Sequence, residues 1–345
     1  EIDAGGIDLS RDFLGRRCRL PLLISCMTGG AGDGSPFNAA LARVAERTGI
    51  AVGLGSMRVL FHDESALADF AVREAAPDVP LLANIGLAQV GEFGAGKIQA
   101  MAGRLGADAI VVHLNPGQEL AQAGGDLDFR RGLAGIGEMV AVGGLPVIVK
   151  ETGFGIRPGR VRELLALGVA GVDLAGAGGT DWLQVEAVRD PALADFAGAF
   201  SGWGLPTALL LAALREGGMP GNVIASGGIR NGVDVAKALA LGAGMAGMAL
   251  PFVRAWRESG SCTGAKRMFR PACVTSAMPA RRHTSRKCEI LNKRSASTGM
   301  GPYRSTSSAR TSSRCGSSAL AAILPYTSRR RRSEGTPATS RLAYL

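Results

Sequence analysis

The chain has 345 residues, 46% of them hydrophobic and 20% charged, which is enough for one large α/β barrel or two ordinary domains. The net charge of +10 is uneven: residues 254–345 hold 19 of the 39 basic and 3 of the 29 acidic residues, so they carry +16 and residues 1–253 carry −6. The longest uncharged stretch, 238–253, is shorter than the roughly 20 residues of a membrane-spanning helix. The first residues lack a signal-peptide pattern. We therefore expect no membrane span.

Short apolar runs, most of them beginning after Pro or Gly, predict eight buried strands. They lie at 21–27, 51–57, 81–87, 109–114, 146–151, 171–176, 223–229 and 245–250. Helical patterns lie between them, most clearly at 37–49, 160–168 and 232–242. Strands that alternate with helices predict a parallel sheet, and continuously apolar strands indicate that both faces are covered. We predict a (β/α)8 TIM barrel over 1–253, with a doubly wound open sheet as the alternative.

Polar residues end or follow most of these strands, and in a barrel those ends form the active-site face. They are Thr28, Ser56, Asn84, His113, Asn115, Lys150, Thr180 and Ser226. The segment HLNPGQEL (113–120) concentrates an imidazole, two carboxamides and a carboxylate directly after a buried strand. A carboxylate there, Glu119, suits Mg²⁺, which binds through one or two carboxylates together with substrate phosphates.

Two glycine-rich turns indicate an anion site. GGIRNGVDVAKALALGA (227–243) opens a helix, whose free backbone N–H groups attract a phosphate, and Arg230 adds a bidentate donor. AGAGGTD (175–181) lets the backbone approach a ligand closely. Lys150 ends a strand and would face an electron-rich ring or a phosphate as a point charge.

The segment 254–345 has no apolar face at either helical or strand period, and its Ser/Arg bias predicts a disordered basic tail. No helix is recognisable after the eighth strand. We consider an out-of-frame translation, and alternatively a tail that binds nucleic acid through its charge. Because aromatic residues are not interleaved with the basic ones, nucleic-acid binding is not favoured. Cys18 and Cys26, the two cysteines before residue 254, fit a reducing cytoplasm.

Several segments together resemble the type 2, flavin-dependent isopentenyl diphosphate isomerases. The matching stretches are PLLISCMTGG (21–30), GLGSMRV (53–59), LLANIGLAQ (81–89), HLNPGQE (113–119), PVIVKETGFGI (146–156), VDLAGAGGTDW (172–182), WGLPTA (203–208) and VIASGGIRNGVDVAKALALGA (223–243). The resemblance implies a TIM barrel that holds FMN and Mg²⁺, uses NADPH as the usual reductant of the flavin, and interconverts isopentenyl and dimethylallyl diphosphate. It also implies a homo-oligomer, a tetramer or an octamer.

By position, the resemblance implies a role for each matching residue. The residues expected to bind FMN are Cys26, Met27, Thr28, Ser56, Asn84, Lys150, Thr180, Gly228, Ile229, Arg230, Ala249 and Leu250. The residues expected to meet the substrate are Met57, Arg58, His113, Asn115 and Gln118. Gln118 would act beside the isoprenoid carbons as the catalytic residue, and Glu119 would hold Mg²⁺.

Three departures from the family pattern bear on activity. Met57 stands where the family usually has glutamine. The chain begins at Glu1 without the family's upstream Arg-Lys segment, so we expect a fragment. The basic tail replaces the family's C-terminal end, so this chain is expected to be truncated and its activity is in question.

The enzyme alternative is an FMN-dependent 2-hydroxyacid oxidase or dehydrogenase, which needs a histidine in the turn after the sixth strand; this chain has AGAGGTD there. A barrel resembling IMP dehydrogenase needs a cysteine in that loop and fails for the same reason. The remaining alternative is a non-catalytic relic with a polyanion-binding tail.

Overall fold

The computed structural model describes residues 6–28 and 34–259, and its centre is a closed barrel of eight parallel strands in the order β10-β3-β4-β5-β6-β7-β8-β9. Their bounds are β3 Leu22–Ile24, β4 Ala51–Ser56, β5 Leu81–Gly86, β6 Ala109–Leu114, β7 Val147–Glu151, β8 Gly171–Asp173, β9 Val223–Ala225 and β10 Met245–Met248. All eight predicted strands are confirmed, and barrel closure excludes the open sheet. The segment after Ser259 lies outside the described residues, so the predicted disorder of the tail stays a prediction.

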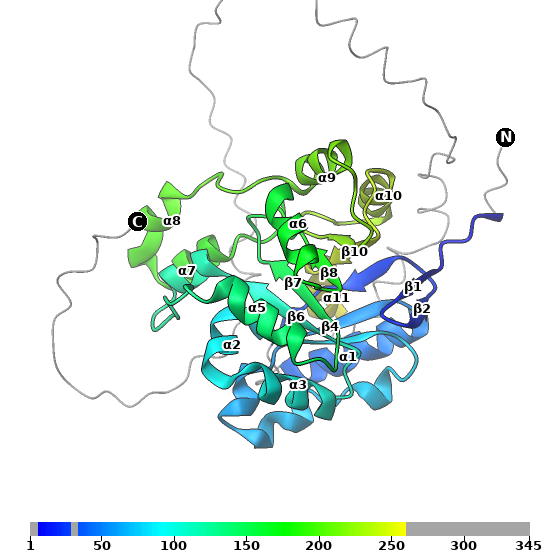
Figure 1. Ribbon diagram of the computed structural model, residues 1–345, viewed down its shortest axis with the longest axis horizontal. Helices are drawn as coiled ribbons and strands as arrows, with labels where there is room; N and C mark the ends of the chain where they lie inside the picture. The colour runs from blue at the N-terminus through cyan, green and yellow to red at the C-terminus, as the bar shows by residue number, and fades with distance from the viewer. Residues whose placement is uncertain (1–5, 29–33, 260–345) are drawn as a thin grey trace, which may run out of the picture.

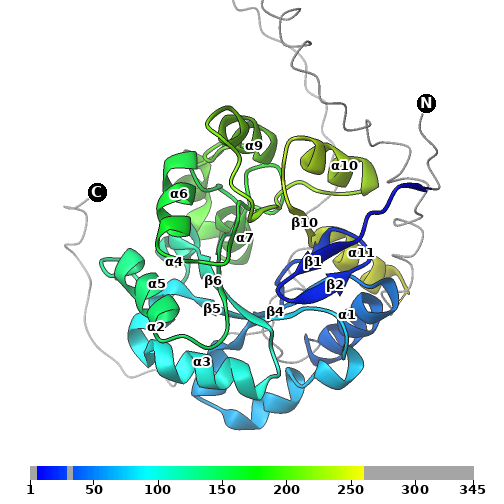
Figure 2. The ribbon, with the colours of Figure 1, turned by 45° about the vertical axis from the view of Figure 1, so that its right-hand side comes forward.

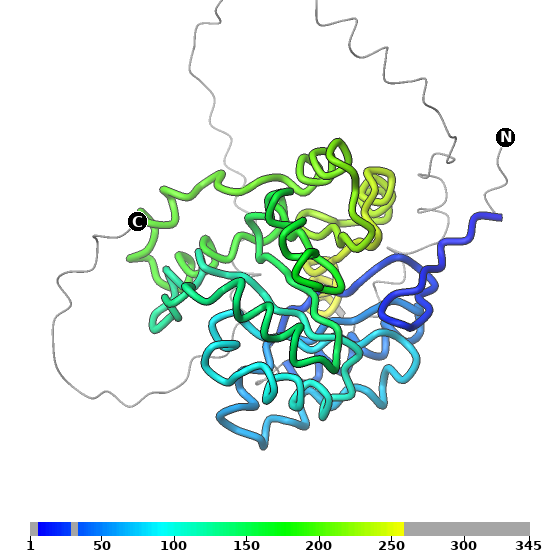
Figure 3. Tube along the Cα trace, in the orientation of Figure 1, coloured from blue at the N-terminus to red at the C-terminus, as the bar shows by residue number. Residues whose placement is uncertain are grey.

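Helices surround the barrel as an outer ring (Figures 1 and 2). They are α1 Gly34–Thr48, α2 Leu87–Phe93, α3 Ala95–Arg104, α4 Pro116–Ala121, α5 Gly132–Ala141, α6 Pro158–Ala166, α7 Trp182–Arg189, α8 Ala194–Ala199, α9 Thr207–Glu216, α10 Gly232–Ala240 and α11 Leu250–Ser259. Short 3₁₀ helices lie at η2 Met57–Phe61, η3 Glu64–Asp69, η4 Arg73–Ala75 and η5 Pro191–Leu193. The segment between α7 and α9, which contains α8, projects away from the barrel (Figure 3).

Strand alternation divides the core into two layers. Outward-facing strand residues such as Val52, Val112 and Val149 pack with the helices in the main hydrophobic cluster. Inward-facing residues form a separate cluster inside the barrel: Leu23, Ala51, Leu82, Ala109, Val111, Ile148, Ile224 and Met245. The barrel is therefore filled with side chains at mid-height, and only its ends can hold a site.

A hairpin of β1 (Arg11–Phe13) and β2 (Arg16–Cys18) packs on this interior cluster through buried Cys18. The sequence did not predict this hairpin, because its strands are three residues long and rich in arginine. Its turn, Leu14-Gly15, has positive φ at both residues (54° and 78°), as a two-residue hairpin turn requires. The hairpin closes the N-terminal end of the barrel, so the opposite end remains for function.

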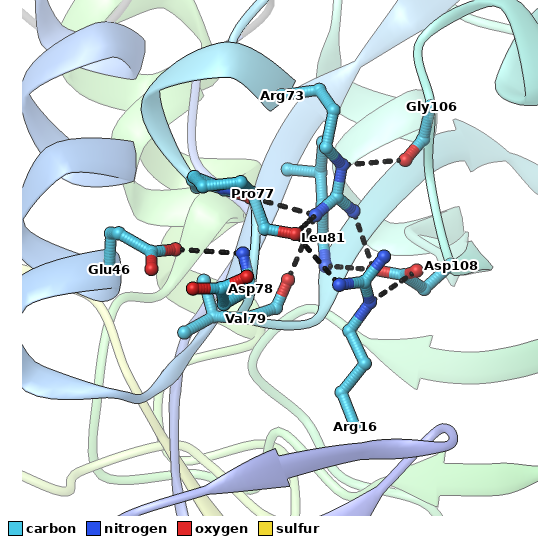
Figure 4. Close-up of polar contacts among 10 residues, drawn as sticks. Arg16, Glu46, Arg73, Pro77, Asp78, Val79, Leu81, Gly106 and Asp108 are labelled. Carbon is cyan, nitrogen blue, oxygen red and sulfur yellow. Dashed lines mark hydrogen bonds and ion pairs between the residues drawn. The ribbon is translucent and has the colours of Figure 1, made fainter.

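Two arginines, Arg16 and Arg73, link neighbouring segments at this closed end (Figure 4). Asp108, just before β6, accepts from Arg16 Nε at 2.7 Å, from Arg73 Nη2 at 2.5 Å and from the Leu81 backbone N–H at 2.8 Å. The Arg73 guanidinium also donates to the carbonyl groups of Ala76, Pro77, Val79 and Gly106. One carboxylate thus joins the hairpin, the segment before β5 and the start of β6.

The helix α11 corrects the expectation that no helix follows the eighth strand and that the barrel sequence stops at 253. It begins at Leu250 and continues to Ser259. Phe252 and Ala255 are buried, and Trp256 packs against Phe37 of α1 with ring centroids 5.6 Å apart and the rings tilted by 53°. The prediction failed because the apolar face spans only two turns before the composition changes.

Within residues 6–28 and 34–259, no helix combines the length and apolarity that crossing a bilayer requires.

Candidate functional site

Polar residues converge inside the barrel at the C-terminal ends of the strands, as the sequence predicted. The parallel register pairs Gly86 with His113, His113 with Lys150, and Lys150 with Asp173, which places these side chains side by side on four neighbouring strands. Ser25 and Ser226 continue the ring. The Lys150 ammonium is therefore flanked by an imidazole on one side and a carboxylate on the other.

His113 is held as a neutral imidazole. Burial, with the Lys150 charge adding to it, lowers the pKa of His113 to about 3. Its Nδ1 lies 2.9 Å from the side-chain oxygen of Asn84, which is buried on β5. A Cβ on Gly86 would stand 3.1 Å from His113 Nε2 and 2.2 Å from Gln89 Oε1. Glycine at 86 thus leaves room for both side chains.

Asp173 is a site residue that the sequence analysis did not assign. It is 1% exposed, and its Oδ1 accepts from Ser226 Oγ at 2.6 Å. Burial raises the pKa of Asp173, while the Lys150 ammonium acts in the opposite direction. The available signal was a single acid within the apolar run GVDLAG, since a carboxylate is rarely buried without a partner.

Glu119 and Gln118 both lie on α4, directly after β6. Glu119 is 6% exposed, and its Oε1 accepts from Asn115 Nδ2 at 2.8 Å. Gln118 donates from Nε2 to Glu186 Oε1 at 3.0 Å, and Glu186 in turn accepts from Arg189. The prediction that Asn115, Gln118 and Glu119 belong to one loop site is thus matched by direct contacts, whereas Glu186, on α7, was missed because nothing local in the sequence singles it out.

Asp126 joins three loops at the barrel mouth. Its Oδ2 accepts from Gln89 Nε2 at 2.6 Å and lies 3.4 Å from Arg58 Nη1. Its backbone N–H donates to Glu119 Oε2 at 2.8 Å. Arg58, predicted to bind an anion, is therefore paired with a carboxylate and half-exposed, beside the loop that carries Glu119. Asp126 was not predicted either.

The two glycine-rich turns pack backbone against backbone. A Cβ on Gly227 (φ +87°) would lie 2.0 Å from Gly176 O, and one on Gly179 would lie 2.8 Å from Gly228 N. Thr207 fixes the second turn by donating from Oγ1 to the carbonyls of Ser226 and Gly227, at 2.7 and 2.8 Å. Any side chain at 176, 179 or 227 would fill this junction, so the turns form a cradle of bare backbone.

Arg230 and the start of α10 lie next to the cradle. Asn231 caps the helix by accepting from the N–H groups of Val233 and Asp234, at 2.9 and 3.0 Å. The Arg230 guanidinium is exposed and lies 3.4 Å from Asp234 Oδ2. An incoming anion would therefore meet an arginine that is only loosely held.

The remaining residues expected at the cofactor differ in whether their side chains already have protein partners. Thr28 Oγ1 donates to Asn38 Oδ1 at 2.7 Å, and Ser56 Oγ accepts from the Arg58 N–H at 3.4 Å, so both hydroxyls already have protein partners. The Cys26 sulfur lies 2.5 Å from the point where a Gly53 Cβ would stand. The others are partly buried at the rim: Met27, Thr180, Gly228, Ile229, Ala249 and Leu250.

Met57 lies elsewhere. Its side chain is 0% exposed and belongs to the main hydrophobic cluster between strands and helices. The structure thus places in the core a residue that the sequence analysis assigned to the substrate, because methionine at the start of η2 packs with its apolar neighbours.

The geometry agrees with the relatives found by sequence. The chain is 44% identical over 254 residues to an isopentenyl-diphosphate delta-isomerase of Borrelia garinii, covering 74% of this chain and 71% of the relative. It is 47% identical to that of Synechococcus (73% and 74%) and 45% identical to that of Aeropyrum pernix (75% and 71%). The chain belongs to the isopentenyl-diphosphate delta-isomerase family. As a member of this family the chain is an isomerase. No model of a protein family matches the chain.

Solved structures show the same fold at greater distance. A mandelate oxidase variant with a monooxide FMN adduct matches with a TM-score of 0.55 and 18% identity, over 80% of this chain and 79% of the other. The same mandelate oxidase variant with (S)-mandelic acid matches with a TM-score of 0.54 and the same identity, over 80% of this chain and 77% of the other. At this identity the likeness establishes the barrel fold alone.

Proposed function

We propose that this member of the isopentenyl-diphosphate delta-isomerase family is of the flavin-dependent, type 2 kind and interconverts isopentenyl and dimethylallyl diphosphate with FMN and Mg²⁺. The observation that carries the proposal is the ring of Asn84, His113, Lys150 and Asp173 at the C-terminal barrel end, beside the backbone cradle. NADPH as the reductant, the homo-oligomer and the reducing cytoplasm remain parts of the same proposal.

The residues at the barrel end fit a flavin. Three buried side-chain atoms in the described part of the chain have no hydrogen-bond partner: Ser25 Oγ, Asn84 Nδ2 and Asp173 Oδ2. Buried polar atoms normally have partners, so Ser25 Oγ and Asp173 Oδ2, both on inward-facing strand ends, indicate a polar ligand. The cradle at Gly176–Gly179 and Gly227–Gly228, with Arg230, offers backbone N–H groups and a cation to a phosphate.

Each residue then has a task in binding or orientation. Lys150 would sit at the flavin ring, on the strand between those that carry His113 and Asp173. Arg58, His113 and Asn115 would hold the substrate diphosphate. Gln118 would lie beside the isoprenoid carbons, with its amide orientation set by Glu186. Reduced FMN, when bound, would supply the acid–base chemistry at the allylic carbons.

A magnesium ion fits only in partnership with the substrate. Within residues 6–28 and 34–259, no three His, Cys, Asp or Glu side chains gather to hold a metal ion. Glu119 offers one carboxylate at the mouth, and Mg²⁺ commonly completes such a site with phosphate oxygens and water. We therefore expect Glu119 to bind Mg²⁺ together with the diphosphate.

The first experiment adds FMN to the purified full chain, removes free flavin by desalting and records the visible absorption spectrum. Isopentenyl diphosphate is then supplied anaerobically with reduced FMN and Mg²⁺, and dimethylallyl diphosphate is measured. Isomer formation that depends on reduced flavin supports the proposal, and Glu119→Gln should raise the Mg²⁺ requirement while Glu92→Gln, an exposed control on α2, does not.

Two other outcomes would each favour one of the alternative functions. Retained flavin without isomerisation, together with oxidation of a 2-hydroxy acid, would favour the oxidase-like alternative. That alternative expects a histidine in the turn after β8, but this turn is AGAGGTD and His113 lies on β6. A folded chain that takes up no flavin and isomerises nothing would favour the relic.

A further inference from the structure

The contact between Asn84 and His113 leaves one polar atom unsatisfied. His113 Nδ1 lies 2.9 Å from Asn84 Oδ1, so the imidazole would have to carry its proton on Nδ1. In that arrangement Asn84 Nδ2 is buried with no well-formed hydrogen bond, and the group beside it is the Cys26 thiol, which is only a weak acceptor. Asn84 is 3% exposed, so water does not readily replace the missing acceptor. An unsatisfied buried N–H group costs about 1–3 kcal/mol.

Turning the Asn84 amide by half a rotation exchanges its oxygen and nitrogen without moving any other atom. Nδ2 then donates to His113 Nδ1. The amide oxygen turns toward the side on which Cys26 lies, and the thiol there is a weak donor. The half-turn therefore gives Asn84 Nδ2 the partner that it otherwise lacks.

A second contact, on the other side of the imidazole, points the same way. Gln89 donates from Nε2 to Asp126 Oδ2 at 2.6 Å, which leaves its oxygen as the atom turned toward Gly86. The position of the missing Gly86 Cβ lies 2.2 Å from that oxygen and 3.1 Å from His113 Nε2. The Gln89 oxygen and His113 Nε2 thus lie around the same point beside Gly86, and a proton on Nε2 suits a position that has an acceptor nearby.

We propose that Asn84 is a positioning residue that holds His113 as the Nε2–H tautomer, with Asn84 Nδ2 donating to Nδ1. His113 then presents a neutral hydrogen-bond donor toward Gly86 and Gln89, at the barrel mouth where Arg58 lies. A neutral donor binds a phosphate oxygen without adding a charge beside the Lys150 ammonium. This use toward an anion rests on the proposed function, whereas the tautomer does not.

The test reads the tautomer directly in the full chain, without substrate. Histidine is labelled with ¹⁵N, and magic-angle-spinning NMR records the imidazole nitrogens, with the signals of residue 113 identified by their loss in His113→Gln. The expected result is a protonated Nε2 and an unprotonated Nδ1. A protonated Nδ1 with an unprotonated Nε2 would overturn the proposal.

Asn84→Asp provides the second arm, because a carboxylate only accepts and should draw the proton to Nδ1 of His113. Asn222→Asp, an exposed change at the opposite end of the barrel, is the matched control and should leave both nitrogens unchanged. If Nδ1 stayed unprotonated in Asn84→Asp, Asn84 would not set the tautomer. If that variant did not fold, the wild-type spectrum would still decide.

Inorganic pyrophosphate separates this inference from the proposed function. Adding it should shift the Nε2–H signal of His113 when the mouth binds a diphosphate. An Nε2–H signal that pyrophosphate leaves unmoved would count against the proposed anion site while the tautomer stood.

Discussion

Gln118 donates its side-chain N–H to Glu186 over 3.0 Å, although the two residues lie on different helices, α4 and α7. Glu186 is 4% exposed and is itself held by Arg189. The Gln118 amide is thereby fixed, with its oxygen turned toward Asn115 Nδ2 at 3.4 Å. A buried carboxylate thus determines the orientation of the amide that we propose as catalytic.

Replacing Glu186 by Gln should misorient Gln118, because a carboxamide can either donate or accept. A hydrogen bond to a charged group contributes about 1.5–3 kcal/mol, so we expect kcat to fall by about 10- to 100-fold. Flavin affinity should remain unchanged. Glu163→Gln, on the exposed face of α6, is the control. Equal kcat in the two variants would show that Glu186 does not orient Gln118.

Lys150→Met should weaken FMN binding and also destabilise the fold. Removing the ammonium leaves buried Asp173 without the nearby cation that favours its charged form, so we expect stability to fall through loss of this electrostatic pairing. Adding Asp173→Asn should restore part of the stability but not the flavin affinity, as measured by urea unfolding and flavin fluorescence. Lys97→Met, on exposed α3, is the control. Failure of the second substitution to restore stability would contradict the pairing.

The buried imidazole predicts a dependence of stability on pH. The pKa of His113 is about 3 in the folded chain and about 6.5 when unfolded, so below pH 6.5 the unfolded state binds the extra proton. Stability from this group is complete above pH 6.5 and is lost as the pH falls toward 3, by about 2 kcal/mol at pH 5.

The free energy of unfolding of His113→Gln, measured at pH 7 and pH 5, checks this. The wild type should lose more stability than the variant over that interval. The raised pKa values of Glu151 and Asp173 act in the opposite sense, which is why the difference between the two chains is the quantity to compare. Parallel losses in both chains would refute the prediction.

Gly227→Ala should disrupt the cradle. The new Cβ would meet Gly176 O at 2.0 Å, and the residue has φ +87°, so we expect a loss of at least about 1–3 kcal/mol in stability together with lost flavin retention. Gly221→Ala is the control, since its Cβ would have no atom within 4 Å. Full flavin retention in Gly227→Ala would argue against this turn as the phosphate cradle.

Asp126→Asn should weaken the apparent affinity for Mg²⁺ and substrate. The change removes the charge that pairs with Arg58, so Arg58 is no longer held beside the loop whose Asp126 N–H donates to Glu119. Asp128→Asn, an exposed change in the same loop, is the control.

Gln89→Ala should lower the same affinities for Mg²⁺ and substrate. The double variant with Asp126→Asn should be no worse than either single variant, since the two side chains act through one 2.6 Å contact. Strictly additive losses would show that they act separately.

The sequence by itself determined the strands, the barrel and most of the polar residues at its C-terminal end. Continuous apolar runs have a period and length that only a buried parallel strand satisfies, and their polar ends fall on one face by the geometry of the fold. For this reason His113, Lys150, Asn84 and Glu119 could be chosen in advance. The short hairpin and α11 were not predicted, because three-residue strands and an apolar helix face of only two turns carry too little pattern.

Only the tertiary structure decided the partners. Asp173, Glu186 and Asp126 became visible through contacts with side chains on other strands and loops, and Met57 proved to lie in the core. Hydrogen bonds between loops distant in sequence leave no local period, because they depend on how the barrel brings successive strand ends together. The sequence thus determined which groups reach the mouth, and the closed barrel decided which of them face each other.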